Sequence, residues 1–297
     1  MTTPTPSPLG RIGLWTAAFE SLPAPAVRDL IAEVDALGFG AVWIPEAVTR
    51  DAIANSMLLL GASERIAVAT GIANIYARDP YTMQASWQTV SEAHPGRFVL
   101  GLGVSHAPMV EDVRHHTYGP PLATMRAYLD AMDSALYLAP PPPVPPQRVL
   151  AALGPKMLAL AAERTDGAHP YFVPPEHTAI AREVMGPDAL LAPEQKVVLE
   201  SDPVAARAIA REAMAMYLTL PNYVNNLLRL GFTTDDVEQA SDRLVDAIVV
   251  WGDVEAVRAR VQAHVDAGAD HVCLQTLPYA DHERTVRDWR TLADALL

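Results

Sequence analysis

Short apolar runs alternate with amphipathic stretches along nearly the whole 297-residue chain. Runs of this kind, bounded by glycine, proline or aspartate, are typical of strands buried on both faces of a parallel sheet. The stretches between them carry apolar residues at helical spacing and end at glycine or proline. Eight such runs are present, at residues 11–15, 41–45, 65–70, 97–103, 148–153, 167–172, 195–200 and 270–277.

Eight strand-helix units in a chain of this length predict a (β/α)8 TIM barrel, with an open doubly wound parallel sheet as the alternative. We therefore expect residues 1–297 to form one barrel domain. Residues 202–268 depart from the repeat, because they are mostly helical and separate the last two strands. This segment is interpreted as a helical insertion before the last strand, covering one end of the barrel.

The composition limits the kind of partner that this chain can have. Its 22 basic and 35 acidic residues give a net charge of −13, which argues against a general nucleic-acid or anionic-membrane binder. No apolar run reaches membrane-spanning length, and the opening "MTTPTPSPLG" lacks the basic start and apolar core of a signal peptide. Residues 1–9 are thus expected to be a flexible leader, and the protein to be cytoplasmic with a small-molecule substrate.

The residues just after each strand are unusual as a set. In a parallel barrel the carboxyl ends of the strands carry the active site. Glu46 follows the second strand, "ATGIANIYARDP" ends the third and "GLGVSH" ends the fourth. The fifth leads to "LGPKML", where Lys156, one of only two lysines, follows a Gly-Pro turn at the start of a helix. That arrangement suits a phosphate, although an exposed lysine without a ligand fits it equally well.

Five stretches together resemble the bacterial luciferase-like superfamily, in particular its coenzyme F420-dependent oxidoreductases. They are "GFGAVWIPE", "ATGIANIYARDP", "GRFVLGLGVSH", "ALGPKMLALAAERTDGAHPYF" and "AGADHVCLQ", and the resemblance extends from Gly10 to Leu297. It implies an oxidoreductase that transfers a hydride between the deazaflavin F420 and a small organic substrate. An FMN-dependent monooxygenase that uses reduced flavin and O2 is the alternative, and a non-catalytic barrel subunit is a weaker one.

The resemblance also implies a set of cofactor-binding residues at the strand ends. Its members have a cis peptide bond after the third strand that supports the ring, and the matching bond here is Gly71–Ile72. Asn74 is expected near the polar edge of the ring or the ribityl chain, and the "GPK" turn near the phosphate. The full set of expected cofactor contacts is Thr70, Gly71, Ile72, Asn74, Gly103, Val104, Ser105, Gly154, Pro155, Lys156, Met157 and His169.

Two strand-end residues are candidates for proton transfer. His106 is the first, since an imidazole exchanges protons near neutral pH, and Glu46 is the second. For His106 a structural role, bonded to a loop carbonyl, stays open.

No metal is expected, because His115 and His116 lie in a loop without carboxylate-histidine spacing and the first strand lacks His-x-His. We also expect a homodimer. Residues 217–232 of the insertion fit a lid over the substrate and a packed core or dimer segment equally well.

Overall fold

The computed structural model describes residues 9–278 and 281–297, so residues 1–8 of the expected leader lie outside the described residues. All its strand ladders are parallel. The strands are β1 Ile12–Trp15, β2 Ala41–Ile44, β3 Ala67–Thr70, β4 Ala73–Asn74, β5 Phe98–Gly103, β6 Gln147–Leu150, β7 Gly167–Ala168, β8 Leu190–Leu191, β9 Glu194–Val198, β10 Val249–Trp251 and β11 Val272–Thr276.

The order of the strands closes the sheet into a barrel. It runs β10-β9-β11-β1-β2-β3-β5-β6-β7-β8, with β4 beside β5. Residues 190–198 form one nearly continuous stretch whose first part, β8, pairs with β7 and whose second part, β9, pairs with β11. One end of the order, β8, thus runs directly into β9, which lies next to the other end, β10. The order closes through residues 190–198, and the predicted (β/α)8 barrel is confirmed.

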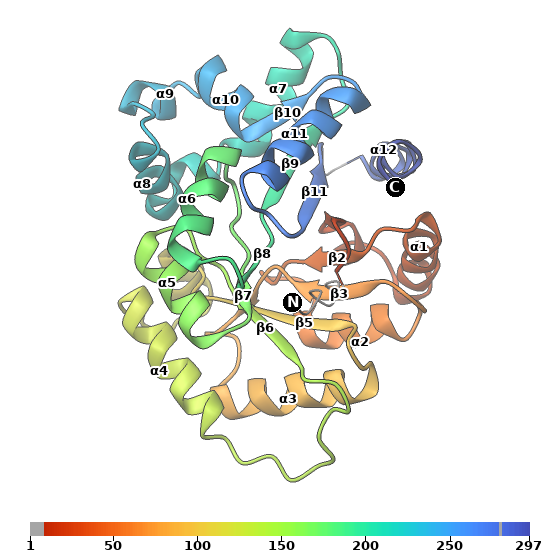
Figure 1. Ribbon diagram of the computed structural model, residues 1–297, viewed down its shortest axis with the longest axis vertical. Coiled ribbons are helices and arrows are strands. Elements are labelled where there is room, and N and C mark those ends of the chain that lie inside the picture. Colours follow the sequence, from red (N-terminus) through yellow and green to blue (C-terminus); the bar gives the residue numbers. More distant parts are fainter. Residues whose placement is uncertain (1–8, 279–280) are drawn as a thin grey trace.

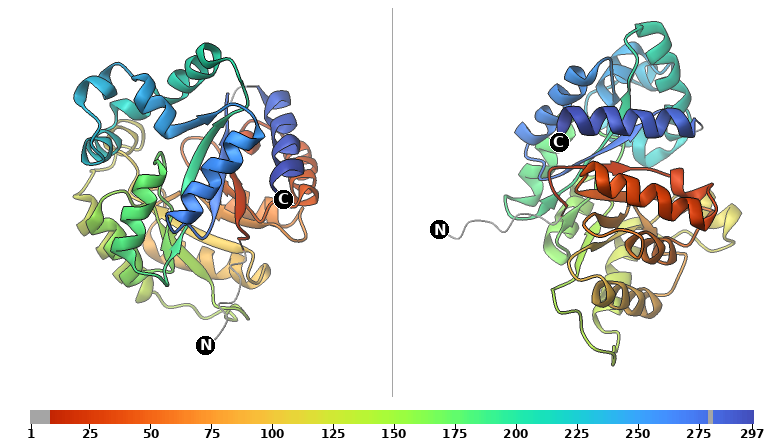
Figure 2. Two further views of the ribbon diagram at one scale, coloured as in Figure 1. Left: turned by 45° about the horizontal axis from the view of Figure 1, so that its top comes forward. Right: turned by 90° about the vertical axis from the view of Figure 1, so that its right-hand side faces the viewer.

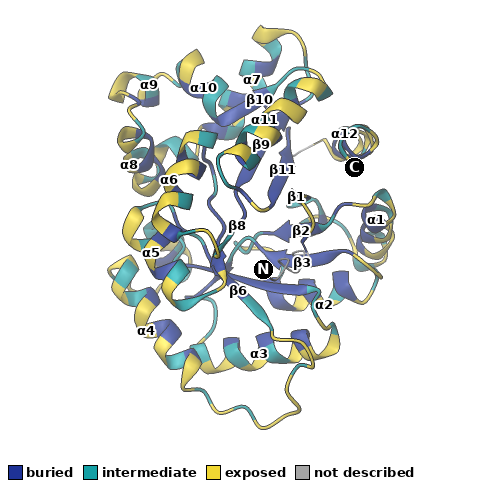
Figure 3. Ribbon diagram, in the orientation of Figure 1, coloured by how far each residue is buried: buried dark blue, intermediate teal, exposed yellow. Residues whose placement is uncertain are grey.

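The helices form an outer layer around the strands (Figure 1). They are α1 Ala24–Leu37, α2 Ala52–Leu60, α3 Pro80–Ala93, α4 Pro121–Asp133, α5 Pro155–Arg164, α6 Pro175–Met185, α11 Val254–Asp266 and α12 His282–Leu296. Asp51 and Asp79 cap α2 and α3 by accepting hydrogen bonds from first-turn amides. The strands are buried and the outer helix faces exposed, as Figure 3 shows. Among the described residues no helix is long and apolar enough to cross a membrane.

The predicted insertion before the last strand is present but is not wholly helical. It contains α7 Pro203–Met214, the short η3 Tyr217–Thr219, α8 Pro221–Arg229, α9 Thr234–Glu238 and α10 Asp242–Ile248, followed by the strand β10. The helices α7 to α10 lie together at one end of the molecule (Figures 1 and 2). Since α11 contacts α6 and α12, it belongs to the outer layer, and the departure from the repeat is confined to α7–β10.

Trp43 occupies the barrel interior next to several small residues. Trp43 is fully buried beside Ala41, Ala67 and Ala69, whose short side chains leave room for it. Cys273 is also fully buried, as its apolar setting predicts, and its Sγ donates to the Pro193 carbonyl (3.3 Å). The same cluster contains Leu9, the last residue of the expected leader, which is buried in the barrel.

The sixth predicted strand, 167–172, is shorter than expected. Regular pairing stops after Ala168, and Phe172 has a left-handed φ of 62°. The residues that leave the strand, among them Tyr171 and Phe172, turn toward the insertion and pack against its rings.

Candidate active site at the strand ends

Gly71 lies at the end of β3, between the rings of Trp15 and His169. The Gly71–Ile72 peptide bond is cis, as predicted. Trp15 Nε1 donates to the Gly71 carbonyl (3.0 Å). A Cβ atom on Gly71 would lie 2.8 Å from Trp15 Nε1 and 3.1 Å from His169 Nε2. Only glycine fits at this position without moving one of the two rings.

His169 lies inside the barrel below Gly71. Its Nδ1 lies 2.7 Å from the Ala192 carbonyl and must therefore carry the proton, which leaves Nε2 as a lone pair with no partner among the described residues. The ring stacks on Trp43 with 4.2 Å between centroids. Burial lowers the pKa of His169 to about 4, so the ring is neutral at physiological pH.

Glu46 is held by four donors at the end of β2. Its Oε2 accepts from the Asn74 amide (2.7 Å) and from Arg78 Nη1 (2.9 Å). Its Oε1 accepts from the Ala52 amide (3.1 Å) and from Arg78 Nη2. The side chain is 3% exposed, so this carboxylate ties the ends of β2 and β4 to the start of α2.

Asn74 is the expected cofactor residue with a free donor. Its Oδ1 accepts from the Tyr76 amide (2.9 Å), while Nδ2 is buried without a partner in the described part of the chain. Thr70, by contrast, uses its hydroxyl to donate to the Gly101 carbonyl (2.7 Å) and to accept from the Gly101 amide (2.8 Å). Gly103 leaves room for Ile72, whose Cδ1 would lie 2.4 Å from a Cβ there.

The loop after β5 carries Val104, Ser105 and His106. Ser105 has a φ of 58°, and its carbonyl accepts from the Tyr118 hydroxyl (3.2 Å). His106 faces the Asn222 side chain, and the centroid of its ring lies 5.6 Å from that of Tyr223. Burial lowers the pKa of His106 below its ordinary value, so the neutral imidazole, a proton acceptor, predominates at neutral pH.

The contacts of Tyr223, a neighbour of His106, show how residues 217–232 pack. Tyr223 belongs to a buried cluster with Phe172 and also borders His106. The segment therefore packs as core, and its role as a lid over the substrate stays a prediction.

The start of α5 brings Gly154, Pro155, Lys156 and Met157 together. No side chain caps this helix, and Pro155 and Lys156 are exposed, while Met157 packs against the core. A second cation, Arg229 of α8, has its Nη2 3.6 Å from where a Gly154 Cβ would lie. An uncapped helix start beside two cations suits an anion. The sequence reading missed Arg229, because only the insertion brings it here.

An aromatic cluster joins the strand ends to the insertion. Tyr171 lies 5.1 Å from Trp15, and Phe172 lies 5.1 Å from Tyr217 and 5.4 Å from Tyr223 between ring centroids. Sequence reasoning also missed two residues behind this cluster, Lys196 and Gln275. The available signal was a lysine inside a buried strand in a chain with only one other.

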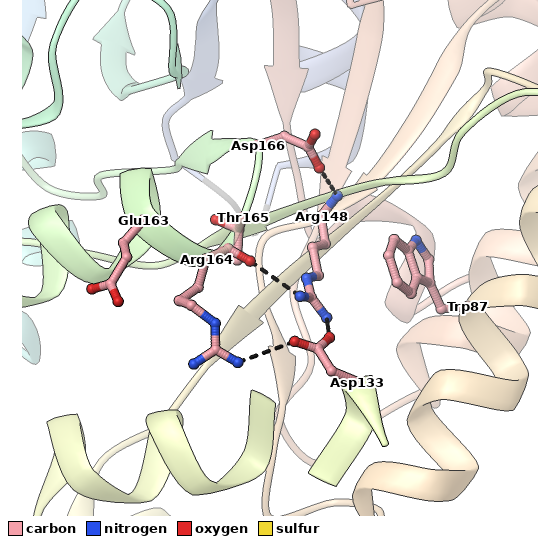
Figure 4. A pocket seen from close by; sticks show the side chains of 7 residues that line it. All are labelled: Trp87, Asp133, Arg148, Glu163, Arg164, Thr165 and Asp166. Carbon is pink, nitrogen blue, oxygen red and sulfur yellow. Dashed lines mark hydrogen bonds and ion pairs between the residues drawn. The ribbon is translucent and has the colours of Figure 1, made fainter. Parts of the chain in front are cut away.

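A cavity of roughly 300 Å³ at the other end of the barrel is a poor candidate for a site. It lies at the starts of β6 and β7 (Figure 4). Arg148 pairs with Asp133 (2.8 Å), Arg164 pairs with the same carboxylate (3.0 Å), and Trp87 covers the Arg148 guanidinium. These charges satisfy one another, and this end of a barrel ordinarily serves stability. In the described residues no group of three His, Cys, Asp or Glu could hold a metal ion.

A closed parallel barrel whose polar and aromatic residues gather at the strand ends has the architecture of a (β/α)8-barrel enzyme. The chain belongs to the luciferase-like monooxygenase family, whose model matches residues 10–271. A Mycobacterium tuberculosis protein, named as a candidate coenzyme F420-dependent oxidoreductase, is 26% identical over 321 residues, covering 87% of this chain and 92% of the relative.

Solved structures of this fold include enzymes of both cofactor types. An F420-dependent secondary alcohol dehydrogenase with an F420-acetone adduct superposes with a TM-score of 0.77 at 14% identity, covering 97% of this chain and 98% of the other. The F420-dependent tetrahydromethanopterin reductase of Methanopyrus kandleri gives 0.75 at 16% identity, covering 96% and 98%. The 3,6-diketocamphane monooxygenase of Pseudomonas putida, bound to FMN, gives 0.71 at 14% identity, covering 97% of both chains.

Proposed function

We propose that this protein is an F420-dependent oxidoreductase that transfers a hydride between the deazaflavin and a small organic substrate. The observation that carries the proposal is the Gly71 position, where Trp15 and His169 leave space only for a glycine, together with the buried donor of Asn74 three residues later. The M. tuberculosis relative and two of the fold neighbours, all named for F420, support the same cofactor.

The residues present fit such a cofactor. Asn74 has an unpaired buried donor for a polar ring edge, and the uncapped start of α5 with Lys156 suits the phosphate. F420 would supply a two-electron hydride carrier. The remaining expected contacts are Thr70, Gly71, Ile72, Gly103, Val104, Ser105, Gly154, Pro155, Met157 and His169. Among these Thr70 and His169 would act by shaping the site, because the Thr70 hydroxyl bonds Gly101 and His169 lies below Gly71.

His106 is proposed as the proton-transfer group, and Glu46 as the residue that orders the Asn74 turn. The neutral His106 imidazole would accept a proton when an alcohol is oxidised, and its conjugate acid would return one in the reverse direction. Glu46 already accepts four hydrogen bonds, which suits it to holding this turn in place.

The alternative is an FMN-dependent monooxygenase, which the FMN-bound fold neighbour favours. Titration of the purified apoprotein with F420 and with FMN, followed by fluorescence, separates the two. We expect F420 to bind at least tenfold more tightly, and tighter binding of FMN would overturn the proposal.

Replacement of Lys156 tests the phosphate part of the site. Lys156→Ala is expected to weaken F420 binding roughly tenfold, about 1.4 kcal/mol, because an exposed cation at a helix start attracts the phosphate. Its melting temperature should stay within about 2 °C of the parent. Arg28→Ala, which removes an exposed cation from α1, is the matched control and should change neither quantity. Equal F420 affinity in Lys156→Ala and parent at moderate salt would contradict the assignment.

We further infer a cytoplasmic homodimer that pairs through α2 and α3. A groove of roughly 420 Å³ between these helices includes Ala54, Met57, Ala85 and Thr89 in its lining. Exposed small and apolar side chains of this kind allow two helix pairs to approach closely. Light scattering should give a dimer mass for the parent and a monomer mass for Ala85→Arg, because the long cation would fill the groove. A monomeric parent, or a dimeric Ala85→Arg, would refute the interface.

A further inference from the structure

Lys196 is a fully buried lysine inside the barrel, and the proposed hydride transfer does not use it directly. It lies on β9 with 0% of its side chain exposed. Its Nζ donates to Glu194 Oε1 (3.1 Å) and to Gln275 Oε1 (3.0 Å), and it lies 3.9 Å from the centroid of the Tyr171 ring. Burial lowers the pKa of Lys196 and raises that of Glu194, so the pair costs stability compared with an apolar core.

The lysine fixes the direction of a hydrogen-bond chain. An ammonium group only donates, so Gln275 must turn its oxygen and not its NH2 group toward Lys196. The Tyr171 hydroxyl donates to that same oxygen (2.8 Å). Since Tyr171 has one hydroxyl proton, the Tyr217 hydroxyl, 2.8 Å away, must donate to Tyr171. Lys196 thereby fixes the direction of the hydrogen bond between the Tyr217 and Tyr171 hydroxyls. Tyr217 belongs to the insertion.

Glu194, the other member of the ion pair, holds the main chain at Phe172, the residue after Tyr171. Glu194 Oε2 accepts from the Phe172 amide (3.1 Å), at the residue with the left-handed φ. Tyr217 and Tyr223 pack on the Phe172 ring, and Tyr223 borders His106. A continuous set of contacts thus leads from the buried pair, through the turn after β7, to the surroundings of His106.

We propose that Lys196 is a positioning residue of the active site, which seats the insertion on the strand ends and so fixes the Tyr171–Tyr217 hydroxyl pair and the environment of His106. This role depends on the proposed function in one respect only, namely that the site is catalytic. The seating itself is a property of the apoprotein and can be measured without cofactor or substrate.

Three variants separate positioning from simple support of the fold. Lys196→Met keeps the length of the side chain but leaves Glu194 unpaired, so it can lose stability. The double variant Glu194→Gln/Lys196→Met removes both charges, keeps an oxygen for the Phe172 amide and should fold. Gln195→Met is the matched control, because Gln195 is also fully buried on β9 but bonds His264 and the Ile248 carbonyl on the outer side of the strand.

Amide hydrogen exchange and histidine NMR of the apoprotein give the result. In the double variant we expect exchange in residues 217–229 to be at least tenfold faster and His106 to titrate closer to 6.5, with a melting temperature within a few degrees of the parent. Gln195→Met should leave both local measurements unchanged. Parent-like exchange and His106 titration in a folded double variant would overturn the proposal, as would the same local changes in Gln195→Met. Failure of the parent to bind F420 would instead refute the proposed function alone.

Discussion

His106→Ala should lower turnover by roughly 10²–10⁴ while leaving F420 affinity within about an order of magnitude. The proposed ring and phosphate contacts are spread over β3, β4 and the start of α5, so one imidazole contributes little to cofactor binding. Hydride transfer, in contrast, needs a proton accepted or delivered at one place. Because burial lowers the pKa of His106, the parent's rate of hydride transfer in the direction that releases a proton should fall only below about pH 6.5.

Stopped-flow measurement of deazaflavin reduction or oxidation decides this prediction once a substrate is found. His116→Ala is the matched control, because His116 lies exposed in the following loop, and it should react at the parent rate. If His106→Ala also reacts at the parent rate with the same pH dependence, His106 is a structural residue. Glu46→Gln provides the comparison with the second sequence candidate. It should weaken cofactor binding together with the rate, because it removes the charge that holds Arg78 beside the Asn74 turn.

Acidification from pH 7 to pH 5 should lower the free energy of unfolding by roughly 5 kcal/mol. Buried histidines carry this effect, and the figure counts the three for which burial lowers the pKa furthest, to about 4 for His169, about 3 for His264 and about 4 for His271. The unfolded chain binds these protons near pH 6.5 and the folded chain does not. The stabilisation is therefore present above pH 6.5 and is lost as the pH falls toward 4.

The hydrogen bonds explain why these rings resist protonation. His271 Nδ1 lies 2.9 Å from the Gly10 carbonyl and its Nε2 accepts from Trp43 Nε1 (3.1 Å). His264 faces Thr178 through Nδ1 and Gln195 through Nε2. A second proton on His271 would sit on Nε2, so that this N–H and the Trp43 Nε1–H would face each other as two donors. A second proton on His264 would add a buried charge without a carboxylate partner.

Urea unfolding at pH 7, 6 and 5 measures the effect. His264→Gln should remove about one third of the pH dependence, whatever its effect on absolute stability, because one of the three rings no longer titrates. His282→Gln, at an exposed position on α12, should leave the dependence unchanged. A free energy of unfolding that is constant over this range would show that the buried rings take up protons without cost.

The sequence determined the barrel because its signal is local and repeated. Most strands are runs of apolar residues buried on both faces, and each helix has its own start and end residues, so the eight units could be recognised one at a time. The strand β9 departs from this pattern, because it begins with Glu194, Gln195 and Lys196. The predicted strands differ from the observed ones where contacts between distant parts of the chain determine the length of a strand or whether it forms. The strand β10 forms only because β9 offers it an edge, and β7 stops early because the following rings turn toward the insertion.

The site shows the same division. Gly71, Asn74, Lys156 and His106 could be named because each directly follows a strand, and parallel strands end at one rim of a barrel. The surroundings of these residues could not be predicted, because they come from distant parts of the chain. Arg78 binds Glu46, and His169 lies next to Gly71. Arg229 reaches the start of α5 only in the folded chain. Lys196 is the clearest case. A buried ammonium is stable only beside Glu194, Gln275 and the Tyr171 ring, and tertiary structure alone brings residues from three separate parts of the chain to that point.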